Sequence, residues 1–241
     1  QRQMCIRDSD NAVIENSKIS EKNKIQNNQS MLDDIMNSTQ YPKQLKDLAL
    51  KNEEALEFVF DYPAEHVKEN TIDLTEEASM DSVPLFVQWD KRWGYEKYSG
   101  NFFAASGCGP TTLSMVVVYL THNRDASPIA VAKYSKEAGY SVDGSGSSWT
   151  LISEGCMHYG VKAKAVALDE SRMKAELDEG HPIVVNVGPG DFTDTGHFMV
   201  ITGYDDEGFS INDPNSIEKS GKRWLFKNIS SQIRAVWSMY V

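Results

Sequence analysis

The distribution of apolar side chains divides the chain into a polar opening segment and a longer apolar body. Residues 1–40 are rich in Asn, Gln, Ser, Lys and Asp and contain few apolar positions. Such a composition buries too little surface to offset the entropy that is lost when a chain is ordered. We therefore predict that residues 1–40 form a disordered linker. Its first residues, Gln1 to Ser9, share no pattern with the remainder of the chain, and we expect this stretch to be non-native.

Residues 41–70 carry apolar side chains at helical spacing, which predicts two short helices that end near Pro63. Asn52 precedes two glutamates and is a typical cap for the second helix. The apolar faces of these helices need a partner, and we expect the domain downstream to supply it. We call this segment the helical prelude. Its apolar positions are Leu45, Leu48, Ala49, Leu56, Val59 and Phe60.

Residues 83–241 form the main body, in which helical patterns come first and strand patterns come second. After an extended entry, the spacing of apolar residues predicts helices at 108–120, 129–138, 149–159 and 170–179. Apolar runs bounded by turn residues predict strands at 182–187, 196–204, 209–213 and 235–240. This order predicts an α+β fold, in which an N-terminal helical half packs on a C-terminal antiparallel sheet.

Composition and charge narrow the choice of partners. A chain of 241 residues with 40% hydrophobic content can bury a sizeable core, and we expect a monomer. The formal charge of −11, without clustered Lys and Arg, excludes nucleic acid as an expected partner. No stretch reaches the roughly 18 consecutive apolar residues that cross a bilayer, so we expect no integral membrane segment in this chain.

The three cysteines, Cys5, Cys108 and Cys156, form neither a CxxC pair nor an even-numbered framework. Zinc sites and disulfide scaffolds both need such patterns, so we expect free thiols and no metal or other cofactor. Cys156 lies in an apolar helical pattern, which is typical of a buried core residue. A reversible disulfide between Cys108 and Cys156 is a further hypothesis.

Cys108 lies between two glycines at the start of the predicted helix, with Pro110 in the first turn. The free amides and positive end of a helix favour thiolate over thiol, and flanking glycines let a substrate backbone approach closely. This position suits a nucleophile. A free cysteine is also often a small buried hydrophobe, so the run by itself leaves both interpretations open.

His197 begins a predicted strand directly after a glycine, and Asp213 ends the strand that returns beside it. A thiolate nucleophile needs a base, and the base needs a group that orients it. If the connecting turn has an odd number of residues, Asp213 lies on the same sheet face as His197. The alternative for Asp213 is a turn residue that caps its own backbone. In combination with Cys108, the functional interpretation is favoured.

Two further features have alternative interpretations. An aromatic cluster precedes Cys108 and predicts core packing, although some rings could line a substrate groove. The loop at 188–196 precedes the candidate base and is either a cleft wall or lid, or an ordinary connection. The aromatic residues are Trp89, Trp93, Tyr95, Tyr98, Phe102 and Phe103.

Four short motifs together resemble a known family. Gln88, the run Gly107–Thr111, the run Gly196–Phe198 and the run Asn212–Pro214 resemble the motifs of papain-like cysteine peptidases related to the bacteriocin-processing, double-glycine leader peptidases of family C thirty-nine. The resemblance covers residues 83–241. It implies a papain-like cysteine peptidase fold in a stand-alone domain.

The resemblance also implies roles for individual residues. Cys108 would be the nucleophile, His197 the general base and then acid, and Asp213 the group that fixes the imidazole tautomer. Gln88 would donate its side-chain amide to the oxyanion, beside the backbone N–H of Cys108. Gln88 stands 20 residues before the cysteine, as in stand-alone members and unlike transporter-fused ones. A satisfied structural amide is the alternative for Gln88.

These residues predict cysteine-dependent hydrolysis of a peptide or amide bond in a peptide or protein substrate. Two alternatives stay open: a catalytically silent papain-like module that binds peptide or cell-wall material, and an amidase or transpeptidase with the same triad. The chain lacks the membrane-spanning and nucleotide-binding domains of transporter-fused relatives. This favours a stand-alone protein that is secreted or held at the cell surface, with its signal or anchor outside this sequence. The helical prelude also resembles that of Gram-positive members of the family, which implies a Gram-positive bacterium as the source.

Overall fold

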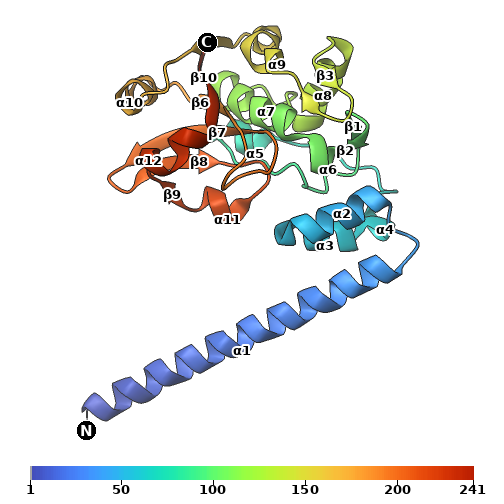
Figure 1. Cartoon of the computed structure of the whole chain (residues 1–241), viewed down its shortest axis with the longest axis vertical. Helices are drawn as coiled ribbons and strands as arrows, with labels where there is room; N and C mark the ends of the chain where they lie inside the picture. The colour runs from blue at the N-terminus through green and yellow to red at the C-terminus, as the bar shows by residue number, and fades with distance from the viewer. Residues whose placement is uncertain (1) are drawn as a thin grey trace. The chain divides into compact units, whose positions relative to one another are not determined.

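The computed structural model describes residues 2–241, and side chains from residue 20 onward. The chain divides into two compact units, residues 1–65 and residues 66–241, each with its own internal contacts. Within the described residues, no helix combines the length and the apolar character needed to cross a bilayer. The candidate chemistry lies in the second unit, whose helices and sheet are shown in green to red in Figure 1.

The first unit is mostly helical, with a non-helical connection at residues 38–42. It contains α1 (Arg2–Asn37), α2 (Lys43–Lys51), the 3-10 helix η1 (Glu53–Ala55), α3 (Leu56–Phe60) and α4 (Tyr62–Glu65). The structure places most of residues 1–40, for which we predicted a disordered linker, in the helix α1. No glycine or proline interrupts this segment, so nothing in the backbone breaks the helix.

The end of α1 is anchored to the helical prelude. Ile35 is fully buried, and Lys46 of α2 donates to the backbone carbonyls of Met36 and Ser38. The helices α2 and α3 contact α1 and each other, so α1 supplies a partner that the prelude was expected to find downstream. Asn52 caps as predicted, because its side chain accepts a hydrogen bond from the backbone N–H of Glu54 at 3.0 Å.

The helical part of the second unit surrounds a central buried helix, α7 (Cys108–Thr121). Every residue from Gly109 to Val118 is buried, which explains the continuous apolar run in the sequence. The other helices are α5 (Thr75–Ala78), α6 (Phe103–Ser106), α8 (Pro128–Glu137), α9 (Thr150–Ser153), η2 (Gly155–Tyr159), α10 (Glu170–Asp178), α11 (Ile217–Ser220), α12 (Phe226–Ile229) and η3 (Ser230–Gln232).

The sheet of the second unit has six antiparallel strands in the order β5-β10-β6-β7-β8-β9. Its strands are β5 (Lys162–Ala165), β6 (Ile183–Val187), β7 (His197–Asp205), β8 (Gly208–Asn212), β9 (Arg223–Trp224) and β10 (Ile233–Tyr240). Two small hairpins lie outside it, formed by β1 (Lys97–Tyr98) with β2 (Asn101–Phe102) and by β3 (Ser141–Val142) with β4 (Gly146–Ser147).

Alternating strand residues contribute to two separate hydrophobic clusters. Val184, Phe198 and Val200 pack with the residues of α7 in the larger cluster. Val185 and Met199, from the alternate positions, pack with residues of α10 and α12 in the second cluster. Helices therefore cover both faces of the sheet, and the predicted α+β architecture with a helical half on an antiparallel sheet is confirmed (Figure 1).

One predicted helix needs correction. The helix expected at 149–159 is broken at Glu154, whose backbone leaves the helical region, and continues as the 3-10 helix η2. Gly155 comes directly after the break and lies against the ring of Tyr140, where a Cβ would come within 3.1 Å of a ring carbon. The break thus coincides with the packing of Gly155 against Tyr140, a tertiary contact that the spacing of apolar residues does not reveal.

Candidate active site

Cys108 is the first residue of α7 and lines a pocket of about 690 Å³. The glycines on either side fit against neighbouring side chains rather than opening the backbone to a ligand. A Cβ at Gly107 would lie 2.6 Å from the ring of Phe103, and one at Gly109 would lie 2.6 Å from the Ser147 hydroxyl. Small residues at both positions therefore allow α7 to begin between α6 and the β3-β4 hairpin.

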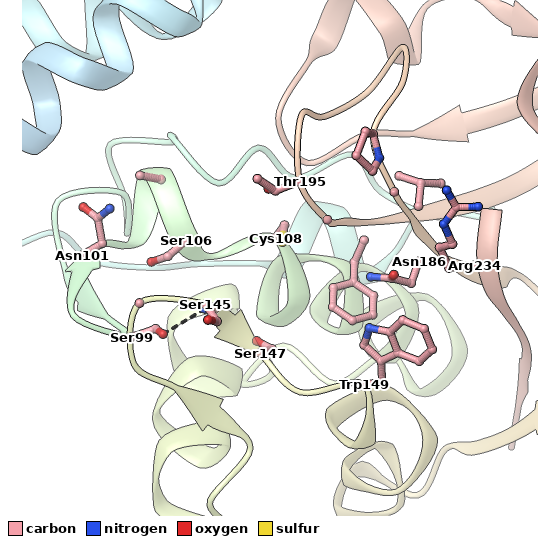
Figure 2. A pocket seen from close by; sticks show the side chains of 18 of the residues that line it. Ser99, Asn101, Ser106, Cys108, Ser145, Ser147, Trp149, Asn186, Thr195 and Arg234 are labelled. Atoms are coloured by element: carbon pink, nitrogen blue, oxygen red, sulfur yellow. Dashed lines mark hydrogen bonds between the residues drawn. The ribbon is translucent and has the colours of Figure 1, made fainter. Parts of the chain in front are cut away.

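The pocket has walls of different chemistry on the two sides of Cys108. Figure 2 shows hydroxyl and amide side chains, including Ser99 and Asn101, on one side, and Trp149 and Arg234 on the other. The remaining lining residues are Gly100, Ala105, Ser106, Gly144, Ser145, Gly146, Ser147, Asn186, Val187, Gly188, Pro189, Thr195, Gly196 and Phe198. Cys108 is only half-buried, so its thiol is reachable from this space.

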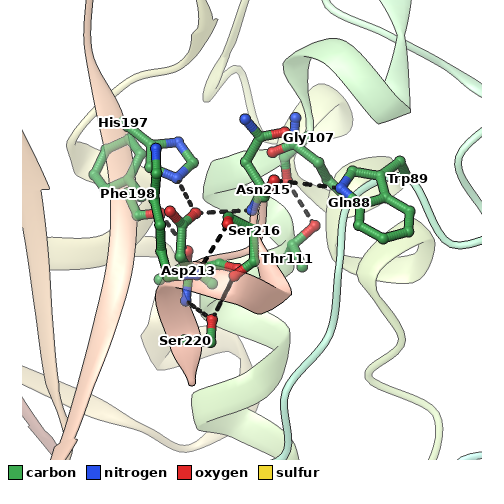
Figure 3. A network of polar contacts seen from close by, with 12 residues as sticks. Gln88, Trp89, Gly107, Thr111, His197, Phe198, Asp213, Asn215, Ser216 and Ser220 are labelled. Atoms are coloured by element: carbon green, nitrogen blue, oxygen red, sulfur yellow. Dashed lines mark hydrogen bonds and ion pairs between the residues drawn. The ribbon is translucent and has the colours of Figure 1, made fainter. Parts of the chain in front are cut away.

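His197 begins β7 and lies beside Asp213, which comes directly after β8. The Nε2 atom of His197 is 2.7 Å from Oδ1 of Asp213, and both side chains are buried (Figure 3). Because Nε2 is engaged by the carboxylate, Nδ1 is the ring nitrogen left for Cys108. The structure thus brings together three residues that span about a hundred positions of the sequence.

A β-bulge aligns His197 with Asp213. The turn between β7 and β8 contains two residues, since Asp205 pairs with Gly208. An even count alone would place the two side chains on opposite faces. The register shifts at Thr202, which adds one unpaired residue to β7 and reverses the parity. The odd count that we expected in the turn is therefore supplied by the strand.

Asp213 also holds its own turn, so the two interpretations of this residue apply at once. Its Oδ1 accepts a hydrogen bond from the backbone N–H of Asn215 at 2.8 Å, and its backbone N–H donates to the Ser220 hydroxyl at 2.9 Å (Figure 3). Among the described residues, Oδ2 is buried without a hydrogen-bond partner. The turn fixes the carboxylate in position, and the same oxygen then orients the imidazole.

The thiol of Cys108 and the ring of His197 shift each other's protonation in opposite directions. Burial disfavours the thiolate, but the hydrogen bond and charge of His197, with backbone hydrogen bonds from Phe198 and Gly109, outweigh burial and lower the pKa of Cys108. Burial opposes the charged ring as well, but Asp213 and then Cys108 raise the pKa of His197 to about 10. Both shifts favour a thiolate–imidazolium pair at neutral pH.

Gln88 lies in a turn outside the pocket lining. Its backbone N–H donates to the carbonyl of Pro214 at 2.7 Å, which links this turn to the Asp213 segment (Figure 3). Its side-chain Nε2 donates to the carbonyl of Ala104 at 2.7 Å, and its Oε1 is buried without a partner among the described residues. The amide is thus partly used in structure and keeps one N–H hydrogen.

The thiol of Cys156 belongs to the core, as predicted. Cys156 is fully buried, and burial raises its pKa to about 11. Both Cys108 and Cys156 are free thiols, so the hypothetical disulfide between them is absent from this structure. Cys5 lies outside the residues whose side chains are described.

The aromatic cluster before Cys108 packs in the core, as its composition predicts. Its buried members are Trp93, Tyr98, Phe102 and Phe103. The aromatic side chain that does line the pocket with a large exposed surface is Trp149, which is 48% exposed and which was not among the residues predicted from sequence. Local pattern gave no signal for it, because its role depends on the neighbouring strand β10.

The loop at 188–196 is a fixed wall of the pocket. Gly188, Pro189, Thr195 and Gly196 line the cavity. The loop is tied to Gln232, whose side-chain Oε1 accepts from the backbone N–H of Asp191 at 2.7 Å and whose Nε2 donates to its carboxylate at 2.6 Å. These bonds support the cleft-wall interpretation over that of a loose connection.

One group of side chains could in principle hold a metal ion. Ligand atoms of Glu176, Glu179 and His181 lie within 4.8 Å of one another, away from the pocket. Glu176 already pairs with Lys164 at 3.1 Å and accepts a hydrogen bond from Ser238 at 2.7 Å. These partners make the group an ion-pair cluster at the end of the sheet, and we assign no metal to it.

Two solved structures of peptidase domains are similar to this chain. The chain is similar to the peptidase domain of Streptococcus ComA, a bi-functional ABC transporter involved in a quorum sensing pathway, with 19% identity and a TM-score of 0.43 over 56% of this chain and 90% of that one. It is also similar to a putative C39-like peptidase from Bacillus anthracis, with 18% identity and a TM-score of 0.41 over 66% of this chain and 95% of that one. No curated protein matches.

A family model provides the assignment. The model of the Peptidase_C39 like family matches residues 80–241, which is more than half of the chain. The matched range includes Cys108, His197 and Asp213, together with the whole six-stranded sheet. The protein therefore belongs to the Peptidase_C39 like family, which confirms the resemblance found in its motifs.

Proposed function

We propose that the protein hydrolyses a peptide bond in a peptide or protein substrate, with Cys108 as the nucleophile. The observation that carries this proposal is the position of His197, which hydrogen-bonds Asp213 at 2.7 Å and shifts the pKa of Cys108 downward. A nucleophile with its base, and a base with its orienting carboxylate, is the arrangement that thiol hydrolysis requires. Membership of the Peptidase_C39 like family supports the choice of substrate class.

The first half of the reaction forms an acyl-enzyme. The thiolate of Cys108 attacks the carbonyl carbon, so that a C–S bond forms and the carbonyl electrons move to the oxygen. When this tetrahedral intermediate collapses, the C–N bond breaks, and the His197 imidazolium gives its proton to the leaving amine. Asp213 keeps the ring in the orientation that presents Nδ1 to the sulfur and the amine.

The second half returns the enzyme to its starting state. Neutral His197 removes a proton from water, and the resulting hydroxide attacks the thioester carbon. The C–S bond then breaks, which releases the carboxylic acid product and leaves the thiolate beside the imidazolium. An amidase would take the same course, whereas a transpeptidase would replace water with an amine acceptor.

The backbone N–H of Cys108 and the remaining N–H of Gln88 are the proposed donors to the oxyanion. The start of α7 leaves first-turn amides without helical partners, which suits them to developing negative charge. Removal of one such donor slows acyl transfer by roughly 10²–10³. Of the two proposed donors, Gln88 is the weaker assignment, since its amide also binds the Ala104 carbonyl. A loss of activity in Gln88→Ala would therefore combine the loss of the donor with the loss of this structural hydrogen bond.

The test is hydrolysis of a library of internally quenched peptides by the full chain in ¹⁸O-labelled water. We expect turnover by the native protein, no turnover by Cys108→Ala, and native turnover by Cys156→Ala, because Cys156 is buried away from the pocket. One ¹⁸O atom in the acid product identifies water as the acceptor, and unlabelled ligated product identifies a transpeptidase.

Alkylation with iodoacetamide separates an active enzyme from a silent binding module. We expect Cys108 to react at neutral pH while Cys156, with its pKa raised to about 11, does not. If Cys108 proves no more reactive than Cys156 and no peptide is cleaved, the thiolate mechanism is wrong and the silent module takes its place.

A further inference from the structure

Among the described residues, Arg234 is the only side chain with a fixed charge in the pocket. Nineteen residues line this cavity, and apart from the Cys108 thiol the others are small, hydroxyl, amide or apolar. No carboxylate is among them. The cleft of a chain with a formal charge of −11 therefore offers one cation and no competing acid.

A β-bulge directs this side chain. In the pairing of β10 with β6, Ile233 is opposite Val187 and Ala235 is opposite Asn186, so Arg234 is the extra residue between them. Bulges change the direction of a side chain and are frequent beside active sites. Figure 2 shows the guanidinium of Arg234 on the same side of Cys108 as Asn186 and Trp149.

The surroundings of Arg234 hold the guanidinium without neutralising it. Its Nη1 donates to the backbone carbonyl of Ser231 at 3.0 Å. The absence of a side chain at Gly188 makes room for it, because a Cβ there would lie 2.8 Å from Nε. Among the described side chains, no carboxylate forms an ion pair with Arg234, and that of Asp191 in the adjacent loop is occupied by Gln232.

Two other arginines of this unit have acidic partners. Arg92 pairs with Glu77 at 2.9 Å and with Asp90 at 3.0 Å, and Arg223 pairs with Asp205 at 2.6 Å. Arg124 and Arg172, like Arg234, form no ion pair among the described residues, so what distinguishes Arg234 is its place in the lining of the pocket. Arg234 keeps most of its N–H donors available in the cavity that contains the candidate nucleophile.

Trp149 adds an apolar surface to the same side of the pocket. It is 48% exposed, and its ring is held edge-on by Trp237 at a centroid distance of 6.0 Å. An indole face beside a guanidinium suits a group with an apolar stem and an anionic end. The hydroxyl-rich opposite side of the pocket offers no such combination among its lining residues.

From the bulge, the space at Gly188 and the unpaired guanidinium, we propose that Arg234 binds a carboxylate of the substrate and selects peptides that carry one near the scissile bond. The carboxylate belongs to an Asp or Glu side chain or to a nearby C-terminus. This inference rests on the proposed function, since it names the substrate class for the same pocket. The net negative charge of the chain repels acidic peptides in general, so the selection is positional rather than overall.

The first test needs no substrate. Iodoacetate and iodoacetamide have the same size and leaving group and differ in the carboxylate. We expect the ratio of their rates at Cys108 to fall about threefold in Arg234→Gln, as one partly exposed charge contact allows. Arg172→Gln removes an exposed charge outside the pocket and should leave the ratio unchanged.

The second test uses quenched peptides in which each position on either side of the cleaved bond is Glu or Gln, with matched sets ending in a free acid or an amide. We expect the native protein to favour Glu about tenfold at one position, or the free acid over the amide, and Arg234→Gln to lose that preference. Arg234→Lys should keep part of it, because it retains charge but not the planar fork.

The outcomes separate this inference from the proposed function. Rapid reaction of Cys108 with iodoacetamide, combined with unchanged reagent and Glu/Gln ratios in Arg234→Gln, overturns the carboxylate site and leaves the peptidase intact. An unreactive Cys108 and no cleavage overturn both. A preference for Glu that survives in Arg234→Gln assigns recognition to another residue and also rejects the inference.

Discussion

At the scale of single residues, the chemistry depends on two groups that stabilise each other's charge. Burial opposes both charged forms, but His197 lowers the pKa of Cys108, and Asp213, followed by Cys108, raises the pKa of His197 to about 10. Asp213 contributes by accepting the Nε2 hydrogen bond at 2.7 Å. Both shifts therefore favour the thiolate–imidazolium form of the pair over the neutral form.

This pairing predicts two different pH profiles. Alkylation of Cys108 should rise with pH through its lowered pKa and then stay on a plateau, because the thiolate persists. Hydrolysis should rise on the same limb but decline as pH passes about 10, where His197 loses the proton that the leaving amine needs. Stopped-time assays over a pH series that brackets both pKa values measure the two limbs.

Asp213→Asn is the variant that tests the origin of these limbs. Loss of the carboxylate lowers the pKa of His197, so the declining limb of hydrolysis should move to lower pH. The thiolate loses part of its partner's charge, so the alkylation limb should move to higher pH. We expect turnover to decrease by on the order of 10²-fold or more. If a folded Asp213→Asn variant shows unchanged pH profiles of hydrolysis and alkylation, Asp213 stabilises its turn and does not act on His197.

At the scale of elements, strand register decides whether the histidine and the aspartate meet. The bulge at Thr202 supplies the one-residue offset that the two-residue turn lacks. The start of α7 is fixed in the same local way, since Gly109 fits beneath Ser147. Strand register and the close fit at Gly109 therefore position the candidate reacting groups.

Deletion of Thr202 should remove the offset and move Asp213 to the other face of the sheet relative to His197. All three candidate catalytic residues would remain in the chain, yet rapid alkylation of Cys108 at neutral pH should be lost. Thr202→Ala keeps the residue count and therefore the offset, so it is the matched control and should keep the native alkylation rate. Circular dichroism melting curves identify any variant that has not folded. A folded Thr202 deletion variant whose Cys108 reacts at the native rate would contradict the claim that the bulge places Asp213 on the face of His197.

Sequence pattern predicted most of the elements that carry the site. Helices α7, α8 and α10 and the four longest strands lie where the apolar pattern indicates them, because their buried residues leave a pattern in the sequence that is continuous in α7 and β6. The short edge strands β5 and β9 were missed, since two to four residues at a sheet edge carry too little burial to leave a pattern. The bulges at Thr202 and Arg234 also leave no pattern in the sequence, because they are defined by which residues pair across neighbouring strands.

At the scale of the whole molecule, the larger unit contains a complete core. Its two hydrophobic clusters draw on no residue before Ile72. The family model likewise begins at residue 80. The chain from residue 66 onward therefore has the means to fold by itself, whatever the helical unit contributes elsewhere.

A chain of residues 66–241 should accordingly unfold in a single cooperative transition and keep the alkylation rate of Cys108 seen in the full protein. Calorimetry and alkylation under matched conditions measure both quantities. A molten or unreactive product would mean that the first unit is required for the fold of the second. Calorimetry of the fragment 1–65 identifies which unfolding transition of the full protein belongs to the first unit.

The sequence by itself determined the fold class, the nucleophile, base and carboxylate candidates, and the family, because helix starts, strand starts and turns are written in short local patterns. Only the tertiary structure decided that His197 and Asp213 share a face, that Gln88 lies outside the pocket lining, and that Trp149 and Arg234 line it. These outcomes depend on register and on contacts between residues far apart in the chain, and the one-residue bulge at Thr202 that decides the face of Asp213 leaves no trace in hydrophobic spacing.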